Sequence, residues 1–82
     1  MAIELTLYSR TGCHLCEAAK RVVAEARRRI VFDYREFDID ADSALCELYN
    51  EEVPVIAING VKAFRYGVDL EALVKRLSGI IG

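Results

Sequence analysis

The first third of the chain changes from one hydrophobic period to another. Apolar and polar residues alternate over residues 2–8, which predicts a strand with Ile3, Leu5 and Leu7 on its inward side. From Leu15 onward, apolar residues recur every three or four positions, which predicts an amphipathic helix of about 15 residues. The buried face of this helix is expected to comprise Leu15, Ala18, Ala19, Val22, Val23, Ala26 and Ile30.

The middle of the chain is expected to form a second strand and a second helix. Residues 31–39 are rich in β-branched and aromatic side chains, and Phe37 and Ile39 are expected to point inward. Asp40 or Asp42 can then accept hydrogen bonds from the first free N–H groups of a helix. The buried stripe of that helix is expected to comprise Leu45, Leu48 and Tyr49.

A continuous apolar run over residues 53–58 is typical of a strand that is covered on both faces. Pro54 is compatible with this interpretation because proline is tolerated where a strand begins. Asn59-Gly60 then predicts a tight hairpin turn, since both residues tolerate a positive φ. The turn leads into residues 61–66, which are expected to form an exposed edge strand.

The C-terminal segment predicts a last helix. Asp69 is expected to cap this helix and Gly79 to end it, with Ile80 and Ile81 folded back on the core. The buried stripe would comprise Leu70, Leu73, Val74 and Leu77. The predicted order is therefore β-α-β-α-β-β-α. Because a strand–helix–strand unit has parallel strands and a hairpin has antiparallel ones, we expect an α/β fold with a four-stranded mixed sheet and helices on both faces. Residues 1–82 are expected to form a single domain.

Composition narrows the classes of function. The chain has 82 residues, 54% of them hydrophobic, and a formal net charge of −2. That balance does not favour binding to nucleic acid. No signal peptide is visible, and the longest apolar run is too short to span a membrane. Three cysteines are an odd number and do not suggest a disulfide framework. We therefore expect a cytoplasmic monomer without a membrane partner.

Cys13 and Cys16 lie where the first strand gives way to the first helix. Residues three apart share a helix face, so the two sulfurs can meet. The positive end of the helix dipole favours a thiolate there, and Cys13 is expected to be the more exposed of the two. Alternatively, the pair simply packs or binds metal. A zinc site would need further ligands, for which the chain offers His14 and Cys46.

Several motifs resemble those of the glutaredoxin and thioredoxin superfamily, particularly small glutaredoxin-like proteins with a C-H-L-C motif. They are residues 8–16, Asp38-Ile39-Asp40 after the second strand, Val53-Pro54 at the start of the third, and Asp69-Leu70 at the last helix. The resemblance implies a thioredoxin-like fold and a thiol–disulfide oxidoreductase. Cys13 would be the nucleophile and Cys16 the resolving cysteine.

The resemblance also implies partners. The substrate would be a protein disulfide or a glutathione mixed disulfide, and the reductant would be glutathione or a reductase. We expect no bound cofactor and no metal. The alternative is a non-catalytic C-x-x-C module that senses oxidation or holds a metal or an iron–sulfur cluster.

Further residues are expected to contact the substrate. The resemblance implies that Arg10 binds a glutathione carboxylate. It also implies a cis Pro54, which would leave the Val53 backbone free to pair with a substrate peptide. Within residues 65–69, Gly67 and Asp69 match part of a glutathione pocket, although Val68 replaces a polar group. The remaining candidates are Thr11 and His14; a charged His14 would stabilise a neighbouring thiolate, while a neutral one would only cover the helix start.

Overall fold

A computed structural model describes residues 3–81 and confirms the predicted order of elements, with one short 3-10 helix added. The strands are β1 (Glu4–Ser9), β2 (Asp33–Asp38), β3 (Val55–Ile58) and β4 (Val61–Arg65). The helices are α1 (His14–Arg27), the 3-10 helix η1 (Ile39–Ala41), α2 (Ser43–Tyr49) and α3 (Leu70–Ile81). The expected start of the first strand at Ala2 lies outside the described residues.

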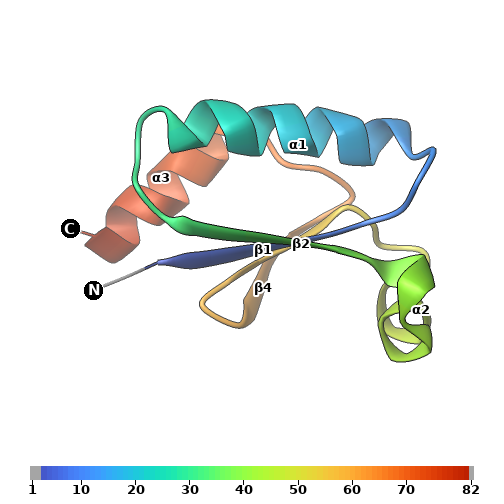
Figure 1. The fold of residues 1–82 in the computed structure, drawn as a ribbon. Helices are drawn as coiled ribbons and strands as arrows, with labels where there is room; N and C mark the ends of the chain where they lie inside the picture. Colours follow the sequence, from blue (N-terminus) through green and yellow to red (C-terminus); the bar gives the residue numbers. More distant parts are fainter. Residues whose placement is uncertain (1–2, 82) are drawn as a thin grey trace.

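The four strands form one mixed sheet in the order β2-β1-β3-β4. β1 is parallel to β2 and antiparallel to β3, and β3 is antiparallel to β4. α1 and α3 cover one face of the sheet, while α2 lies on the other side, near the end at which β1 leads into α1 (Figure 1). The expected mixed sheet with helices on both faces is therefore confirmed.

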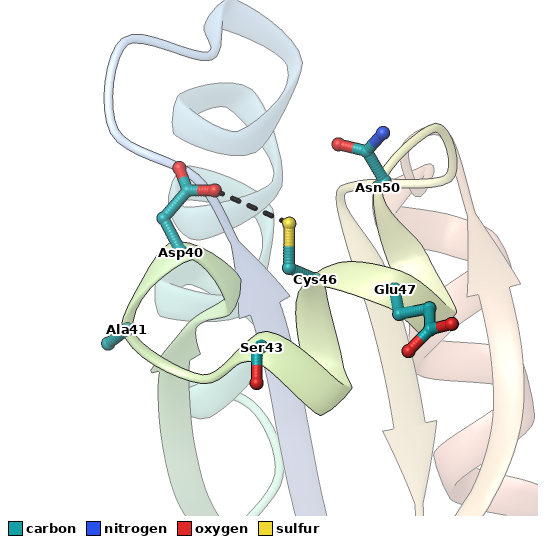
Figure 2. A pocket seen from close by; sticks show the side chains of 6 residues that line it. All are labelled: Asp40, Ala41, Ser43, Cys46, Glu47 and Asn50. Carbon is teal, nitrogen blue, oxygen red and sulfur yellow. Dashed lines mark hydrogen bonds between the residues drawn. The ribbon is translucent and has the colours of Figure 1, made fainter.

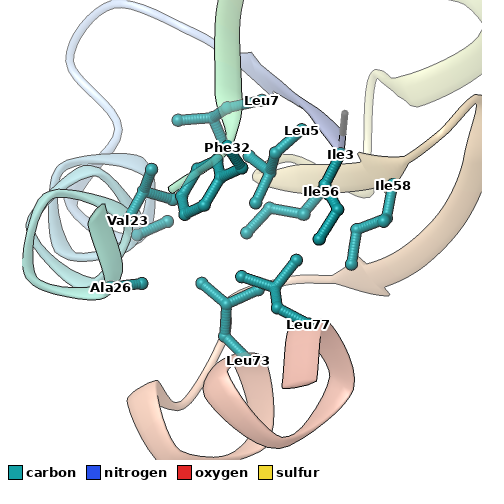
Figure 3. Close-up of a cluster of buried hydrophobic side chains, with 11 residues drawn as sticks. Ile3, Leu5, Leu7, Val23, Ala26, Phe32, Ile56, Ile58, Leu73 and Leu77 are labelled. Carbon is teal, nitrogen blue, oxygen red and sulfur yellow. The ribbon is translucent and has the colours of Figure 1, made fainter. Parts of the chain in front are cut away.

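The main core lies between the sheet and the helices α1 and α3 (Figure 3). The alternation predicted for the first strand is confirmed, since Ile3, Leu5 and Leu7 are all buried. The cluster is completed by Ala19, Val23, Ala26, Phe32, Ile56, Ile58, Leu73 and Leu77. All residues of β3 are buried, as the continuous apolar run predicted.

The expectation that Phe37 points into the core is wrong. Tyr34 packs against the main core, so Phe37, three positions later, lies on the opposite face of β2. There its ring stacks on Tyr8 at 5.9 Å between centroids, and Tyr8 in turn contacts Tyr49 of α2 at 4.7 Å. Because the short helix α2 covers only one end of that face, Phe37 remains 42% exposed.

Two leucines that were expected to be buried are exposed. Leu15 is 55% exposed because the buried stripe of α1 runs through Cys16, Ala19, Val23 and Ala26, and Leu15 lies at its border on the first turn. Leu48 of α2 is 62% exposed, whereas Leu45 and Tyr49 are half-buried. Both exposed leucines lie near the ends of helices, where fewer neighbours cover an apolar side chain.

The helix ends agree with the predictions in part. The Asp42 carboxylate accepts hydrogen bonds from the N–H groups of Ala44 and Leu45, and so caps α2. Asp69 caps α3 in the same way through Ala72. Gly79 does not end α3, which continues to Ile81, since glycine costs a helix only about 1 kcal/mol. Ile80 is 42% exposed rather than folded onto the core, and the Ile81 side chain lies outside the description.

Candidate active site

Three segments meet at one end of the sheet, where β1 and β4 end and β3 begins. Tyr8 of β1 pairs with Val55 of β3, and Val55 pairs with Arg65 of β4. The residues that follow Tyr8, precede Val55 and follow Arg65 must therefore emerge at the same end. This geometry brings the cysteine loop, the Val53-Pro54 segment and the residues after β4 to a common site.

Cys13 is the N-cap of α1. Its backbone is extended, with φ −94° and ψ 114°, and its Sγ accepts the N–H of Cys16 at 3.2 Å. Its carbonyl oxygen accepts the N–H of Glu17 at 3.1 Å, which begins the helical hydrogen-bond pattern. Cys13 is half-buried, so its sulfur remains accessible to a substrate.

Cys16 has the opposite character. It lies on the first turn of α1, is fully buried and is a free thiol, as are Cys13 and Cys46. The pKa of Cys16 is raised to about 11, chiefly by burial and also by the hydrogen bond with Cys13 and the charge of Cys13, while the Arg10 backbone and Lys20 lower it. The pair therefore combines one accessible sulfur with one buried sulfur that is protonated at neutral pH.

Arg10, which precedes this pair, is held by other residues of the chain. Its Nε lies 3.2 and 3.0 Å from the two carboxylate oxygens of Asp40, and its NH2 donates to the side-chain oxygen of Asn50 at 2.6 Å. Asp40 raises the pKa of Arg10, chiefly through these hydrogen bonds, and Arg10 lowers the pKa of Asp40 for the same reason. The expectation that Arg10 binds a substrate carboxylate stays a prediction, and it would require these contacts to open.

Cys46 lines an open depression of about 560 Å³ beside the same network (Figure 2). Its Sγ lies 3.8 Å from an Asp40 oxygen and 3.6 Å from NH2 of Arg10. Ser43, Glu47 and Asn50 line the remainder of the depression together with Asp40 and Ala41. Cys46 thus belongs to the contacts that fasten α2 to the residues before Cys13.

The other residues predicted around the pair lie in two groups. Thr11 and His14 are exposed on either side of Cys13. Gly12, with φ +79°, supplies the left-handed turn that leads into the cysteine. On the facing segment, Val53 is half-buried and Pro54 is buried, and the bond between them is cis, as the family resemblance implied.

The residues after β4 complete this end of the sheet. The N–H of Tyr66 donates to the carbonyl oxygen of Glu52 at 2.9 Å, which fixes this segment next to Val53. Gly67 has φ +146° and is half-buried, whereas the Asp69 carboxylate caps α3. Tyr66 also has a positive φ, of 66°, which is uncommon for a bulky residue.

The sequence analysis missed the pairing of Arg10 with Asp40 and Asn50. Asp40 was considered only as a helix cap, because a local pattern does not reveal a partner thirty positions away. Within residues 3–81, no three histidine, cysteine or acidic side chains are grouped so that they could hold a metal ion. No helix in that part of the chain is long and apolar enough to cross a membrane.

Comparison with known proteins places this geometry in a family. Residues 4–78 match the model of the glutaredoxin-like domain (DUF836). The X. campestris protein XcR50 is 33% identical, with 92% of this chain and 96% of that chain covered and a TM-score of 0.77. Protein Ne2328 from Nitrosomonas europaea is 27% identical over 93% of this chain and 92% of its own, with a TM-score of 0.78.

Chloroplastic thioredoxin z shares the fold at low sequence identity. It is 13% identical, with 98% of this chain and 79% of that chain covered and a TM-score of 0.81. The element order and the four-stranded mixed sheet agree with these likenesses. The chain therefore belongs to the glutaredoxin-like domain family and has the thioredoxin fold.

Proposed function

We propose that the protein is a dithiol–disulfide oxidoreductase in which Cys13 attacks and Cys16 resolves. The observation that carries the proposal is the contrast within the pair: the accessible Sγ of Cys13 accepts the Cys16 N–H at 3.2 Å, and the Cys16 thiol is buried. Since a thiolate is the attacking species in thiol–disulfide exchange, this contrast assigns the two roles.

In the first step, the Cys13 thiolate attacks one sulfur of a substrate disulfide. A bond forms between Cys13 and that sulfur, the substrate S–S bond breaks, and the second sulfur leaves as a thiolate that takes a proton from water. In the second step, Cys16 loses its proton to water and attacks the Cys13 sulfur. The mixed disulfide breaks, and the first substrate sulfur leaves as a thiol. The substrate has gained two electrons, and Cys13 and Cys16 share a disulfide.

Return to the dithiol requires two electrons and two protons from a thiol reductant, either glutathione or a protein reductase. The backbone of Val53, next to Pro54 at the same end of the sheet, is available to align the substrate as an added strand. Thr11, His14 and Gly67 border the space in which the substrate sulfur would lie. We further propose that the protein acts as a cytoplasmic monomer without a bound cofactor.

The roles can be tested in a single turnover with bis(2-hydroxyethyl) disulfide, followed by acid quenching and mass spectrometry. Wild-type protein is expected to lose two hydrogens as the 13–16 disulfide forms. Cys16→Ser should stop at a mixed disulfide on Cys13. Cys13→Ser should react with the disulfide much more slowly than the wild-type protein. Cys46→Ser is the matched control and should behave as wild type. Unchanged reaction of Cys13→Ser, or a wild-type protein that never forms the 13–16 disulfide, would contradict the proposal.

A further inference from the structure

The charges of this molecule are unevenly distributed in space. Residues 36–61 contain no lysine, arginine or histidine, yet they hold seven of the thirteen acidic residues of the chain: Glu36, Asp38, Asp40, Asp42, Glu47, Glu51 and Glu52. Six of these seven, all except Glu36, lie at the end of β2, on η1, on α2 and on the segment before Pro54. We call these six residues the acidic end. By contrast, the three consecutive arginines at residues 27–29 lie at the far end of α1.

The acidic end adjoins the cysteine pair. α2 lies at the same end of the molecule as the loop that joins β1 to α1 (Figure 1), and this loop passes beside Asp40 (Figure 2). Asn50, just after α2, accepts hydrogen bonds from Arg10 through its side chain at 2.6 Å and through its backbone at 3.3 Å. These contacts fasten the acidic end to the residues that precede Cys13.

The cation nearest to Cys13 in sequence is already neutralised. Asp40 pairs with the Arg10 guanidinium, so that an anionic substrate would have to displace a carboxylate that the fold itself supplies. On the other side of the site, Lys62 and Arg65 pair with Glu52 at 2.7 and 3.9 Å. His14 lies exposed beside Cys13, and Lys20, whose charge lowers the pKa of Cys16, pairs with Glu17 and Glu36 at 3.7 and 3.4 Å.

Four carboxylates of the acidic end form no ion pair among the residues that the structure describes: Asp38 and Asp42, which cap helices, and Glu47 and Glu51. Within residues 3–81, no lysine, arginine or histidine forms an ion pair with Glu47 or Glu51. Both line an open depression of about 310 Å³ that Glu52, Arg65 and Tyr66 also line, so that three carboxylates and one guanidinium border it. Glu51 is also only two residues before Val53. A peptide that aligned along Val53 would therefore pass close to a net negative charge.

We infer that the cysteine pair selects disulfides on cationic segments and disfavours anionic ones such as glutathione disulfide. The inference rests on the proposed function and names the substrate class of that site. Charged clefts raise the rate of association with oppositely charged ligands, and the effect weakens as salt screens it. The class of substrate is thus a protein disulfide whose flanking residues include lysine or arginine.

The test compares three small disulfides of different charge at pH 7: cystamine, which is a dication, neutral bis(2-hydroxyethyl) disulfide, and glutathione disulfide, which is an anion. The rate at which each disulfide oxidises the reduced protein is divided by the rate at which the same disulfide reacts with 2-mercaptoethanol. This ratio corrects for differences in intrinsic reactivity among the three disulfides. At low ionic strength the normalised rate with cystamine should exceed that with glutathione disulfide about tenfold or more. In about 0.5 M salt the ratio should fall toward one.

The charge variant is the double substitution Glu47→Gln and Glu51→Gln. It should lower the cystamine preference about threefold or more and leave the rate with the neutral disulfide unchanged. The matched control, Glu25→Gln with Asp33→Asn, removes two carboxylates near the far end of α1 and at the start of β2, and should leave the preference unchanged.

The outcomes distinguish a failure of the substrate inference from a failure of the proposed function. A preference for glutathione disulfide, or a cystamine preference that neither salt nor the Glu47 and Glu51 substitutions reduce, would overturn the inference and leave the oxidoreductase proposal intact. Absence of reaction with all three disulfides would overturn the proposed function itself.

Discussion

The burial of Cys16 predicts a large difference in reactivity between the two sulfurs of the pair. Burial is the main cause that raises its pKa from the ordinary 9.0 to about 11, and it does not depend on Cys13. Each unit changes the thiolate fraction tenfold, so at pH 7 the fraction of Cys16 present as thiolate is about one hundredth of that of an unperturbed thiol. Because alkylating reagents attack the thiolate, the rate should fall by about the same factor.

The assay uses Cys13→Ser with Cys46→Ser, which leaves Cys16 as the single thiol. The rate of iodoacetamide alkylation is measured by mass spectrometry from pH 7 to pH 10, in buffer and in concentrated urea. Folded protein at pH 7 should react more slowly than the unfolded chain, by a factor below about 100 because the contribution of Cys13 to the raised pKa is absent from this variant, with any steric protection adding to that factor. The logarithm of the folded rate should still be rising at pH 10, because burial, the largest cause of the raised pKa, remains in this variant. Cys16→Ser with Cys46→Ser, in which Cys13 is the single thiol, should react faster than the Cys16 variant throughout the neutral range.

Two results would refute this reasoning. One is a folded rate that levels off near pH 9, which would mean that burial does not disfavour the thiolate of Cys16. The other is an equal rate in buffer and in urea at pH 7, which would mean that the sulfur is accessible and that the two cysteines are not differentiated by the fold.

Three further predictions follow from the fold. Leu7→Ala removes a fully buried side chain and should lower the free energy of unfolding by about 2–5 kcal/mol, measured by urea denaturation; a loss below about 1 kcal/mol would contradict the packing described for β1. Asp42→Ala removes the cap of α2 and should cost about 1 kcal/mol in the same assay, with Asp42→Asn largely retaining the cap. The raised pKa of Cys16 also predicts that the free energy of unfolding depends on pH. The contribution of the Cys16 thiol to stability is fully present below about pH 9 and is lost as pH rises toward about 11, because the unfolded chain releases this proton at lower pH than the folded protein. Wild type should therefore lose about 2–3 kcal/mol more stability than Cys16→Ala above that range, and equal losses in the two proteins would exclude this contribution.

Local sequence was sufficient for most of the secondary structure. Alternation in the first strand and the three- and four-residue period of the first helix depend only on which face of an element meets the core, and both predictions hold for residues 3–81. The same is true of the cysteine pair, because residues 13 and 16 are joined by the first turn of α1 whatever surrounds them. The Asn59-Gly60 turn is equally local, and both residues have a positive φ.

The predictions of burial were wrong where more than one face of a strand or helix could have packed on the core. Phe32 and Phe37 are both aromatic and lie on opposite faces of the same segment, and only the packing of α1 and α3 decides that Phe32 fills the core. Leu15 and Leu48 fit the helical period, yet no neighbour covers them near the helix ends. A hydrophobic period identifies the side of an element that could be buried, but the extent of burial depends on partners elsewhere in the chain.

The sequence by itself therefore determined the order of the elements, the family and the position of the cysteine pair, because these depend on short-range patterns and motifs. Only the tertiary structure decided the electrostatic setting of that pair. Arg10 is paired with Asp40 and Asn50, which are 30 and 40 positions away, and α2 is brought to the same end of the molecule as the cysteine loop. Coulomb interactions depend on distance in space rather than along the chain, so a net charge of −2 could not reveal where the uncompensated charges gather.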